Sequence, residues 1–236
     1  MSQVGILQQK ERGKMMKLNK QVCFSNKKVC FSNKKVCFSN KKPDVRFLYD
    51  AKKVLYDQKW VKKMPDIELY YMYRGLKRKG DLRCDITAIP PMVLGKEFVK
   101  TIGHEHKNNF AELYIVLEGK AIYLAQKRDA KGGLIDVFAV EASKGEAVIV
   151  PNGYGHVTVN PGQKKLIMAN WISEKCINEY DIFSKKRGAC YYCIKGSGKK
   201  KYKWIKNKSY KTIPNLRFEK SLKQIPKNLD FLKKNQ

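Results

Sequence analysis

The strongest constraint on the fold of this chain is the spacing of its three histidines relative to glycines, a glutamate and a proline. Written with their spacing, the two blocks are His104-x-His106-x5-Glu112-x6-Gly119 and Gly145-x5-Pro151-x-Gly153-x2-His156-x3-Asn160. The glycines permit tight turns. The proline has no backbone N–H, so it marks a position that donates no hydrogen bond to a neighbouring strand. The blocks therefore predict short strands joined by turns, with the histidines on the strands or at their ends.

Apolar segments recur at intervals of roughly ten residues, and turn residues separate them. The predicted strands cover residues 67–73, 82–89, 98–106, 112–118, 121–126, 137–140, 147–150, 156–160 and 166–171. This pattern is typical of an all-β barrel or sandwich.

The histidines are candidate metal ligands. His104 and His106 are two residues apart, so on a strand their side chains point to the same face. Glu112 adds a carboxylate, and His156 adds a third imidazole from a separate strand. Three nitrogens and one carboxylate suit a borderline divalent metal. The sequence therefore predicts one divalent transition metal (Fe, Mn, Ni or Zn) on His104, His106, Glu112 and His156.

The two blocks resemble the two signature motifs of the cupin superfamily. The second block matches at all five positions, and the first departs only in having five residues between His106 and Glu112, where three or four is usual. The resemblance implies an all-β fold of the cupin type, a double-stranded β-helix or jelly-roll barrel. We expect this barrel to have flexible basic termini.

Within the cupins, residues 67–194 resemble the archaeal-type glucose-6-phosphate isomerase family. The blocks that carry the resemblance are Gly80-Asp81-Leu82, Thr87, Gly95-Lys96-Glu97-Phe98, Thr101-x-Gly103-His104-x-His106, Ala111-Glu112-x-Tyr114, Leu124-x-Gln126, Val150-Pro151 and His156-x-Thr158-Val159-Asn160. The resemblance implies a metal-dependent aldose-ketose isomerase that interconverts glucose 6-phosphate and fructose 6-phosphate in glycolysis and gluconeogenesis.

The resemblance also implies which residues form the site. The metal ligands would be the four residues named above. The phosphate and sugar contacts would be Thr87, Thr101, Gly103, Tyr114, Tyr70 or Tyr73, and Tyr180. The chain departs from the family pattern at two places: Asn178-Glu179-Tyr180 stands where the family has His-Asp-Tyr, and Ile172 stands where a tyrosine is common. These departures concern the sugar contacts and leave the metal ligands unchanged.

The expected chemistry names Glu112 and His156 as catalytic residues. Moving a carbonyl between C1 and C2 of an open-chain sugar requires a proton transfer or a hydride shift beside a carbonyl. A divalent metal that binds the two adjacent oxygens acts as a Lewis acid, and Glu112 could carry the proton. The sequence leaves open the choice between an enediol and a hydride-shift mechanism.

Three other functions fit parts of the sequence. A metal-dependent cupin dioxygenase can use the same ligand set, and oxygen uptake would distinguish it. A non-catalytic sugar-binding cupin would have little need for all four ligands. RNA or membrane-surface association through the basic ends would depend on salt.

The charge is concentrated at the ends of the chain. Of the formal net charge of +29, residues 1–42 carry +10 and residues 185–236 carry +15, so the centre is nearly balanced. The excess is mostly lysine, whereas bidentate phosphate or base recognition favours arginine. We therefore expect no specific nucleic-acid partner and no membrane partner.

The predicted organisation has three parts. Residues 1–42 contain three copies of Val-Cys-Phe-Ser-Asn-Lys-Lys and are predicted to be a disordered low-complexity extension whose deletion leaves the fold unchanged. Residues 43–198 form the cupin barrel domain. Residues 199–236 form a lysine-rich C-terminal tail, which we expect to pack loosely or not at all.

Cysteine use and the first residues suggest a compartment. Seven cysteines, an odd number, fit a reducing environment, and Cys190-x-x-Cys193 lies in a predicted strand with no second pair nearby. Residues 1–20 lack the apolar stretch of a secretory signal. We expect a cytoplasmic protein and, from the resemblance, a homodimer that binds a phosphosugar.

Overall fold

The computed structural model describes residues 31–32, 35–36, 41–198 and 201–233. Two compact units are distinguished, Met1–Lys42 and Pro43–Gln236. In the first unit, β1 (Phe31–Ser32) pairs with β2 (Lys35–Val36) in antiparallel fashion. The predicted disorder of residues 1–42 falls mostly outside the described residues and stays a prediction.

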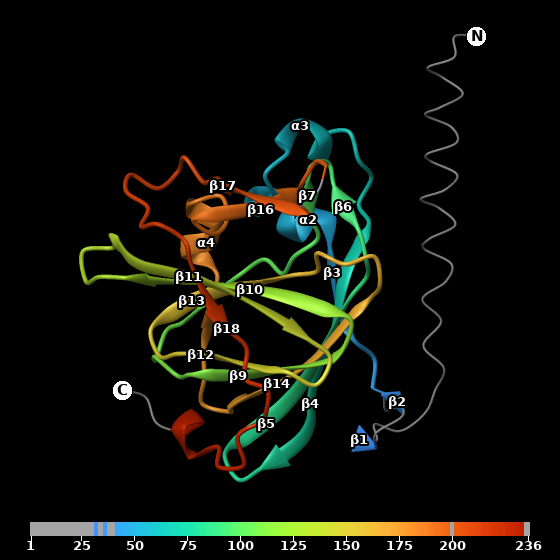
Figure 1. The fold of residues 1–236 in the computed structure, drawn as a ribbon, viewed down its shortest axis with the longest axis vertical. Helices are drawn as coiled ribbons and strands as arrows, with labels where there is room; N and C mark the ends of the chain where they lie inside the picture. The colour runs from blue at the N-terminus through green and yellow to red at the C-terminus, as the bar shows by residue number, and fades with distance from the viewer. Residues whose placement is uncertain (1–30, 33–34, 37–40, 199–200, 234–236) are drawn as a thin grey trace. The chain divides into compact units, whose positions relative to one another are not determined.

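The second unit is built around a six-stranded sheet in the order β12-β9-β14-β5-β4-β3 (Figure 1). Its strands are β3 (Asp44–Phe47), β4 (Glu68–Lys79), β5 (Leu82–Ile89), β9 (Glu112–Glu118), β12 (Ala147–Val150) and β14 (Leu166–Ser173). All neighbours in this sheet are antiparallel.

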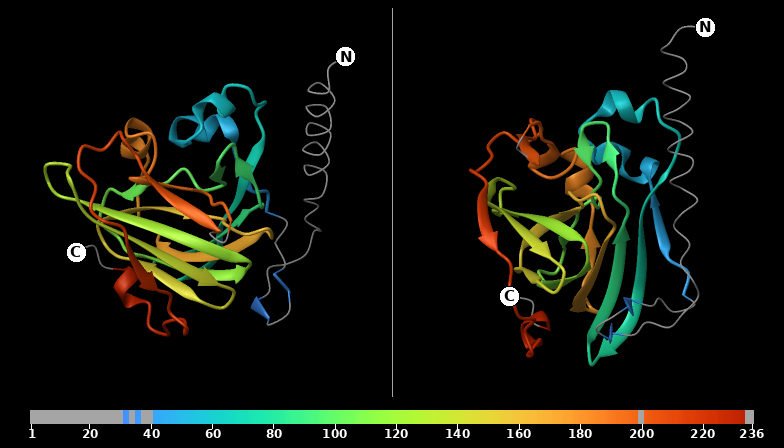
Figure 2. Two further views of the ribbon diagram at one scale, coloured as in Figure 1. Left: turned by 45° about the horizontal axis from the view of Figure 1, so that its top comes forward. Right: turned by 45° about the vertical axis from the view of Figure 1, so that its right-hand side comes forward.

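A four-stranded sheet faces the six-stranded one, and the two form the walls of the barrel (Figure 2). Its order is β13-β10-β11-β18, with β10 (Lys120–Arg128), β11 (Leu134–Ser143), β13 (Tyr154–Val159) and β18 (Arg217–Lys220). The prediction of an all-β barrel is confirmed.

Two smaller sheets and short helices lie at the ends of the barrel strands. The smaller sheets are β17-β16-β7-β6 and β15-β8, with β6 (Val93–Leu94), β7 (Glu97–Phe98), β8 (Glu105–His106), β15 (Asn178–Glu179), β16 (Tyr191–Lys195) and β17 (Tyr202–Lys206). The helices are α2 (Leu48–Ala51), η1 (Lys52–Val54), α3 (Gln58–Val61), α4 (Asp181–Lys185) and η2 (Asp230–Leu232).

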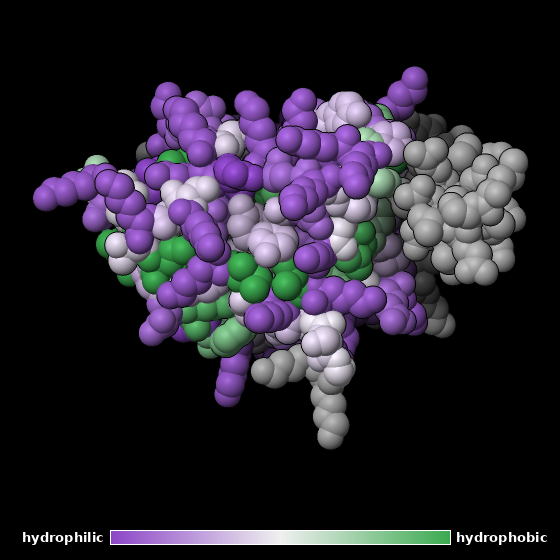
Figure 3. Space-filling model, turned by 90° about the horizontal axis from the view of Figure 1, so that it is seen from above, coloured by the Kyte–Doolittle hydropathy of each residue, from purple (hydrophilic) through white to green (hydrophobic). Residues whose placement is uncertain are grey.

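The core lies between the two large sheets. Apolar side chains of β10, β11 and β13 meet those of β9 and β14, and Tyr123, Leu124 and Leu166 are at most 1% exposed. Burial of such side chains supplies the main favourable free energy of the fold. Hydrophilic side chains cover most of the face shown in Figure 3, with smaller hydrophobic areas between them.

The C-terminal segment is packed against the barrel, contrary to the expectation of loose packing. Strand β18 pairs in parallel with β11, and Leu222 exchanges backbone hydrogen bonds with Ala147 at 2.8 and 2.9 Å. Leu232 is fully buried in a cluster with Leu82 and Leu113. The lysine-rich composition misled the prediction, because lysines on one face of a segment do not prevent apolar residues on the other face from packing.

Two further features concern the cysteines and the helices. Among the described residues, Cys84, Cys176, Cys190 and Cys193 are buried free thiols, so the Cys-x-x-Cys pair is part of the packed core. In the part of the chain that is described, no helix is long and apolar enough to cross a membrane.

Candidate functional site

Local backbone pairing brings the four predicted metal ligands together. His104 and His156 form an isolated antiparallel bridge in which each amide donates to the other's carbonyl, at 3.2 and 2.9 Å. His106 ends β8 and pairs with Asn178 of β15. Glu112 begins β9. Residues that are up to 52 positions apart in the chain therefore present side chains to one point.

The donor atoms are spaced as the ligands of one ion would be. His104 Nε2 lies 3.2 Å from His106 Nε2. Glu112 Oε2 lies 3.2 Å from His156 Nε2, 3.3 Å from His106 Nε2 and 3.9 Å from His104 Nε2. Donors bound at about 2.1 Å to a common ion are roughly 3–3.5 Å apart when adjacent. The four ligand atoms lie within 4.8 Å of one another.

The two carboxylate oxygens of Glu112 give the clearest indication that these residues fit a cation. Its Oε1 accepts a hydrogen bond of 2.6 Å from Asn170 Nδ2. Its Oε2 is buried and has no hydrogen-bond donor among the described residues, although it faces three imidazoles. A buried carboxylate oxygen without a donor is costly, and a divalent ion between it and the imidazoles would remove that cost.

The imidazole of His106 is oriented for metal binding. Its Nδ1 lies 2.6 Å from the carbonyl oxygen of Phe110. A carbonyl can only accept, so Nδ1 carries a proton and Nε2 is the ring nitrogen that faces the cluster. This arrangement, in which the second ring nitrogen is fixed by a hydrogen bond, is usual for metal-binding histidines.

The electrostatics of the cluster favour a positive charge. Burial acts against ionisation of Glu112, but the neighbouring imidazoles of His106 and His156 outweigh it and hold the pKa of Glu112 well below its ordinary value. Burial, followed by the charge of His156, lowers the pKa of His104 well below its usual range. Glu112 is therefore ionised and His104 neutral, the forms in which both donate electron pairs to a metal.

The unusual five-residue spacer is accommodated by a left-handed residue. Asn109 lies between His106 and Glu112 with φ of 54°, a conformation that asparagine tolerates better than most residues. Its amide donates to the His106 carbonyl at 3.0 Å, and its own carbonyl accepts from Asn152 Nδ2 at 2.7 Å. The extra residue therefore closes as a turn and leaves both ligands in place.

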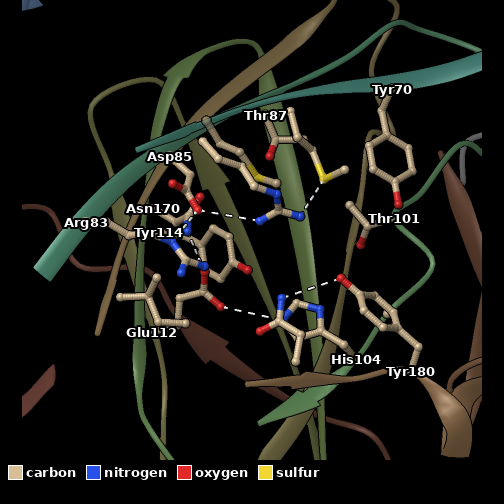
Figure 4. Close-up of a pocket in the computed structure, with 16 residues that line it drawn as sticks. Tyr70, Arg83, Asp85, Thr87, Thr101, His104, Glu112, Tyr114, Asn170 and Tyr180 are labelled. Atoms are coloured by element: carbon tan, nitrogen blue, oxygen red, sulfur yellow. Dashed lines mark hydrogen bonds and ion pairs between the residues drawn. The ribbon is translucent and has the colours of Figure 1, made fainter. Parts of the chain in front are cut away.

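A pocket opens beside the cluster, with about 560 Å³ of empty space that includes its open mouth. Its lining consists of Tyr70, Met72, Arg74, Arg83, Asp85, Thr87, Thr101, Gly103, His104, Glu112, Tyr114, Met168, Asn170, Ile172, Asn178 and Tyr180. Figure 4 shows Arg83, Asp85 and Asn170 on one side of this pocket and Tyr70 and Thr101 on the other.

Alternation along the strands explains one wall of the pocket. Residues that face each other across antiparallel strands share a side of the sheet. Tyr114, Asn170 and Asp85 form one such row across β9, β14 and β5. A second row across β14, β5 and β4 consists of Met168, Thr87 and Met72. The wall is therefore a lattice of alternate residues on the inner face of the six-stranded sheet.

The segment before His104 forms the opposite wall. Thr101 pairs with Thr158 of β13 through the backbone, and its hydroxyl accepts from the Thr158 amide at 3.0 Å. Gly103 has φ of 88°, and a Cβ there would lie 2.4 Å from Val157. A larger residue at Gly103 would therefore displace the neighbouring chain.

The residues predicted to contact the substrate line this pocket, with Tyr70 rather than its alternative Tyr73: Tyr70, Thr87, Thr101, Gly103, Tyr114 and Tyr180. His106 and His156, predicted ligands, lie behind His104 and Glu112 at 5% and 2% exposure. Their individual roles remain predictions. Ile172 and Asn178, the two departures from the family pattern, also line the pocket, so they alter its surface.

Four polar residues of the pocket were missed by the sequence analysis: Arg74, Arg83, Asp85 and Asn170. Arg83 and Asp85 lie at two-residue steps before Thr87 on β5. Period-two alternation from Thr87 was the available signal, and it would have placed both on the pocket face.

The barrel and the cluster of three histidines and one glutamate at its pocket define a cupin. A sequence model of the family described as Glucose-6-phosphate isomerase matches residues 47–211. The chain therefore belongs to the glucose-6-phosphate isomerase family, which confirms the predicted resemblance and the prediction of an isomerase.

Curated relatives of the same name support the assignment. Glucose-6-phosphate isomerase of Thermococcus litoralis is 31% identical over 148 residues, covering 60% of this chain and 75% of the relative. The Pyrococcus abyssi protein of that name is 36% identical over 129 residues, covering 52% and 66%. A putative glucose-6-phosphate isomerase of Rhizobium meliloti is 30% identical over 117 residues, covering 49% and 52%.

Solved structures show more distant similarity. Oxalate oxidase in complex with glycolate is 14% identical with a TM-score of 0.35, covering 43% of this chain and 49% of the other. Oxalate decarboxylase from Bacillus subtilis at pH 4.6 is 19% identical with a TM-score of 0.32, covering 44% and 25%.

Proposed function

We propose that this protein interconverts glucose 6-phosphate and fructose 6-phosphate, with a divalent transition metal bound by His104, His106, Glu112 and His156. The observation that carries the proposal is Glu112 Oε2, a buried carboxylate oxygen without a hydrogen-bond donor that faces three imidazoles at the wall of a pocket. The family match supports the reaction and the substrate. We infer no preference among Fe, Mn, Ni and Zn.

The pocket suits an open-chain phosphosugar. When bound, the metal would act as a Lewis acid toward the two adjacent sugar oxygens. His104 and Glu112 form the part of the cluster that faces the pocket, so the reacting carbons would lie against them. The hydroxyls of Thr87 and Thr101 and the amide of Gly103 would hold the far end of the substrate and thereby orient C1 and C2.

Glu112 is the proposed proton carrier between C1 and C2. It is the carboxylate among the lining residues that lies beside the cluster, and its low pKa means that it starts in the basic form. Asn170 holds Oε1 and thereby fixes the plane of the carboxylate. His156, 3.2 Å from Oε2, and Tyr114, whose hydroxyl lies 2.8 Å from His156 Nε2, would support the charge of that group.

A coupled isomerase assay tests the proposal. The purified chain should convert fructose 6-phosphate to glucose 6-phosphate, lose activity with a chelator and recover it when a divalent transition metal is added back. Absence of turnover in metal-loaded protein, with oxygen consumption on a thiol instead, would replace this proposal by the dioxygenase alternative.

A further inference from the structure

Two arginines and one aspartate on the six-stranded sheet have no role in the chemistry described above. Arg74 of β4 and Arg83 of β5 both line the pocket, and Asp85 lies between them. Asp85 Oδ2 is 3.1 Å from Arg83 Nε and 3.6 Å from Arg74 Nη1. The Asp85 side chain is only 4% exposed, whereas those of Arg74 and Arg83 are 34% and 21% exposed.

A bulge in β4 positions Arg74. The register between β4 and β5 shifts between Tyr73 and Lys77, and Gly75 has φ of 62° there. The Gly75 amide donates a hydrogen bond of 2.6 Å to Asp85 Oδ1. Bulges of this kind redirect neighbouring side chains, and Asp85 fixes this one by binding both the bulged backbone and the arginine beside it.

The guanidinium of Arg74 lies beside Met72, the cross-strand neighbour of Thr87. Arg74 Nη2 lies 3.4 Å from Met72 Sδ, and Met72 is the cross-strand partner of Thr87. Arg74, Thr87 and Thr101 all line the pocket. Arg74 therefore faces the same space as the neutral donors Thr87 and Thr101.

The guanidinium of Arg74 can attract an anion although it is paired with Asp85 and Asp44. Arg74 and Arg83 carry two positive charges against one on the buried Asp85. Asp44, 3.2 Å from Arg74 Nε, is 61% exposed, so water screens its charge. A sugar phosphate carries a dianionic group at one end, and a guanidinium binds phosphate oxygens through paired donors.

We propose that Arg74 binds the phosphate group of the sugar substrate and that Asp85 is its positioning residue. This proposal rests on the proposed function, and it adds a charged contact to the neutral ones predicted at Thr87, Thr101 and Gly103. Arg83 neutralises part of the Asp85 charge, which leaves more of the Arg74 charge for the substrate. The phosphate end would then lie at β4 and β5, and the reacting end at Glu112 of β9, on opposite sides of β14.

Arg74→Gln tests the proposal, with Arg78→Gln as the matched control. Arg78 is on the same strand, forms an exposed ion pair with Glu174 and does not line the pocket. In metal-loaded protein, Arg74→Gln should raise KM for fructose 6-phosphate by about 10- to 100-fold, the scale of one charged hydrogen bond, and change kcat by less than about threefold. The KM of Arg74→Lys should lie between those of the wild type and Arg74→Gln. Asp85→Asn should raise KM by a smaller factor than Arg74→Gln does.

Inorganic phosphate provides a second readout that does not need turnover. Calorimetric titration should show phosphate binding to the metal-loaded wild type and to Arg78→Gln, with at least a tenfold weaker Kd for Arg74→Gln. If the wild type has no isomerase activity but phosphate binding still depends on Arg74, the anion site stands and the proposed function fails. An active wild type with unchanged KM and phosphate Kd in Arg74→Gln would overturn the anion site alone. A fall in kcat at unchanged KM would place Arg74 at the reacting end and would also overturn it.

Discussion

The side-chain amide of Asn170 donates a 2.6 Å hydrogen bond to Glu112 Oε1, and both groups are buried on the inner face of the six-stranded sheet. This contact turns Oε2 toward the three imidazoles. Asn170→Ala should therefore weaken metal binding by about 10- to 100-fold, the usual effect of removing a group that orients a ligand. Competition with a chelating dye measures the dissociation constant. Asn228→Ala, at an exposed asparagine whose side-chain oxygen accepts from the Asp230 amide, is the control; equal affinities in the two variants would contradict the orienting role.

The metal content of histidine variants tests the ligand assignment itself. The wild type should bind about one divalent ion per chain, since four donors converge on one point. His104→Ala and His156→Ala should each lose most of that ion, because each variant leaves only three of the four ligands. Elemental analysis after gel filtration gives the stoichiometry. Full metal content in both variants would show that the ion is bound elsewhere.

Glu112→Gln separates the two mechanisms that the site allows. The amide keeps an oxygen near the imidazoles but removes the charge and the basicity, so kcat should fall by at least about 100-fold. Metal content must be measured in the same samples, since part of the loss could come from the ion. Unimpaired turnover in metal-loaded Glu112→Gln would remove the carboxylate from the proton transfer and favour a hydride shift.

The packing of the C-terminal segment predicts a stability effect at Leu232. This side chain is fully buried against Leu82 and Leu113, so Leu232→Ala should lower the free energy of unfolding by about 2–5 kcal/mol. Leu222→Ala, at a side chain that is 38% exposed, should cost about 1 kcal/mol or less. Urea denaturation of both variants measures the difference. Equal small effects would mean that the segment contributes little to the stability of the barrel.

Acid should weaken the attachment of β18. Arg217 donates two hydrogen bonds to Asp136, at 2.9 and 2.7 Å, and this interaction, opposed by partial burial, lowers the pKa of Asp136 from 3.8 to about 2. Since the folded-state pKa is the lower one, the pair stabilises the fold fully above about pH 4 and loses its effect as the pH falls toward 2. After allowance for solvent screening, the contribution is about 1 kcal/mol.

Asp136→Asn measures that contribution. The variant should be less stable than the wild type at pH 7, and the difference should disappear near pH 2. The control is Asp181→Asn, which removes an exposed pair with Lys185 and should change stability little at either pH. A difference between Asp136→Asn and the wild type that persists at low pH would contradict the assignment of the lowered pKa to this pair.

The sequence predicted the barrel strands well where strands are continuous. Residues 82–89 and 112–118 form β5 and β9 with the predicted limits, because apolar side chains are buried along these strands and turns bound them. Residues 98–106 do not form the predicted single strand. Gly103 interrupts them with a positive φ, and the chain there pairs with β13 only through isolated bridges. Such pairing depends on tertiary neighbours that periodicity does not reveal.

The candidate site was predictable where motif spacing carried the information. The four residues of the cluster are brought together as the spacing predicts, since histidine and glutamate are identifiable by type. Asn170 and Arg74 were missed because their place depends on which strands are neighbours, namely β14 beside β9 and β4 beside β5. Strand order in a sheet is set by long-range packing, and sequence distance gives little indication of it.

The position of β18 also determines when the barrel can be completed during synthesis. This strand covers the edge of β11, and its residues leave the ribosome more than 70 positions after those it pairs with. Until residues 217–220 have been synthesised, a nascent chain therefore presents an unpaired strand edge, a surface to which other extended chains can add. We expect premature termination before residue 217 to give chains that aggregate through this edge while retaining every residue of the metal-ligand cluster.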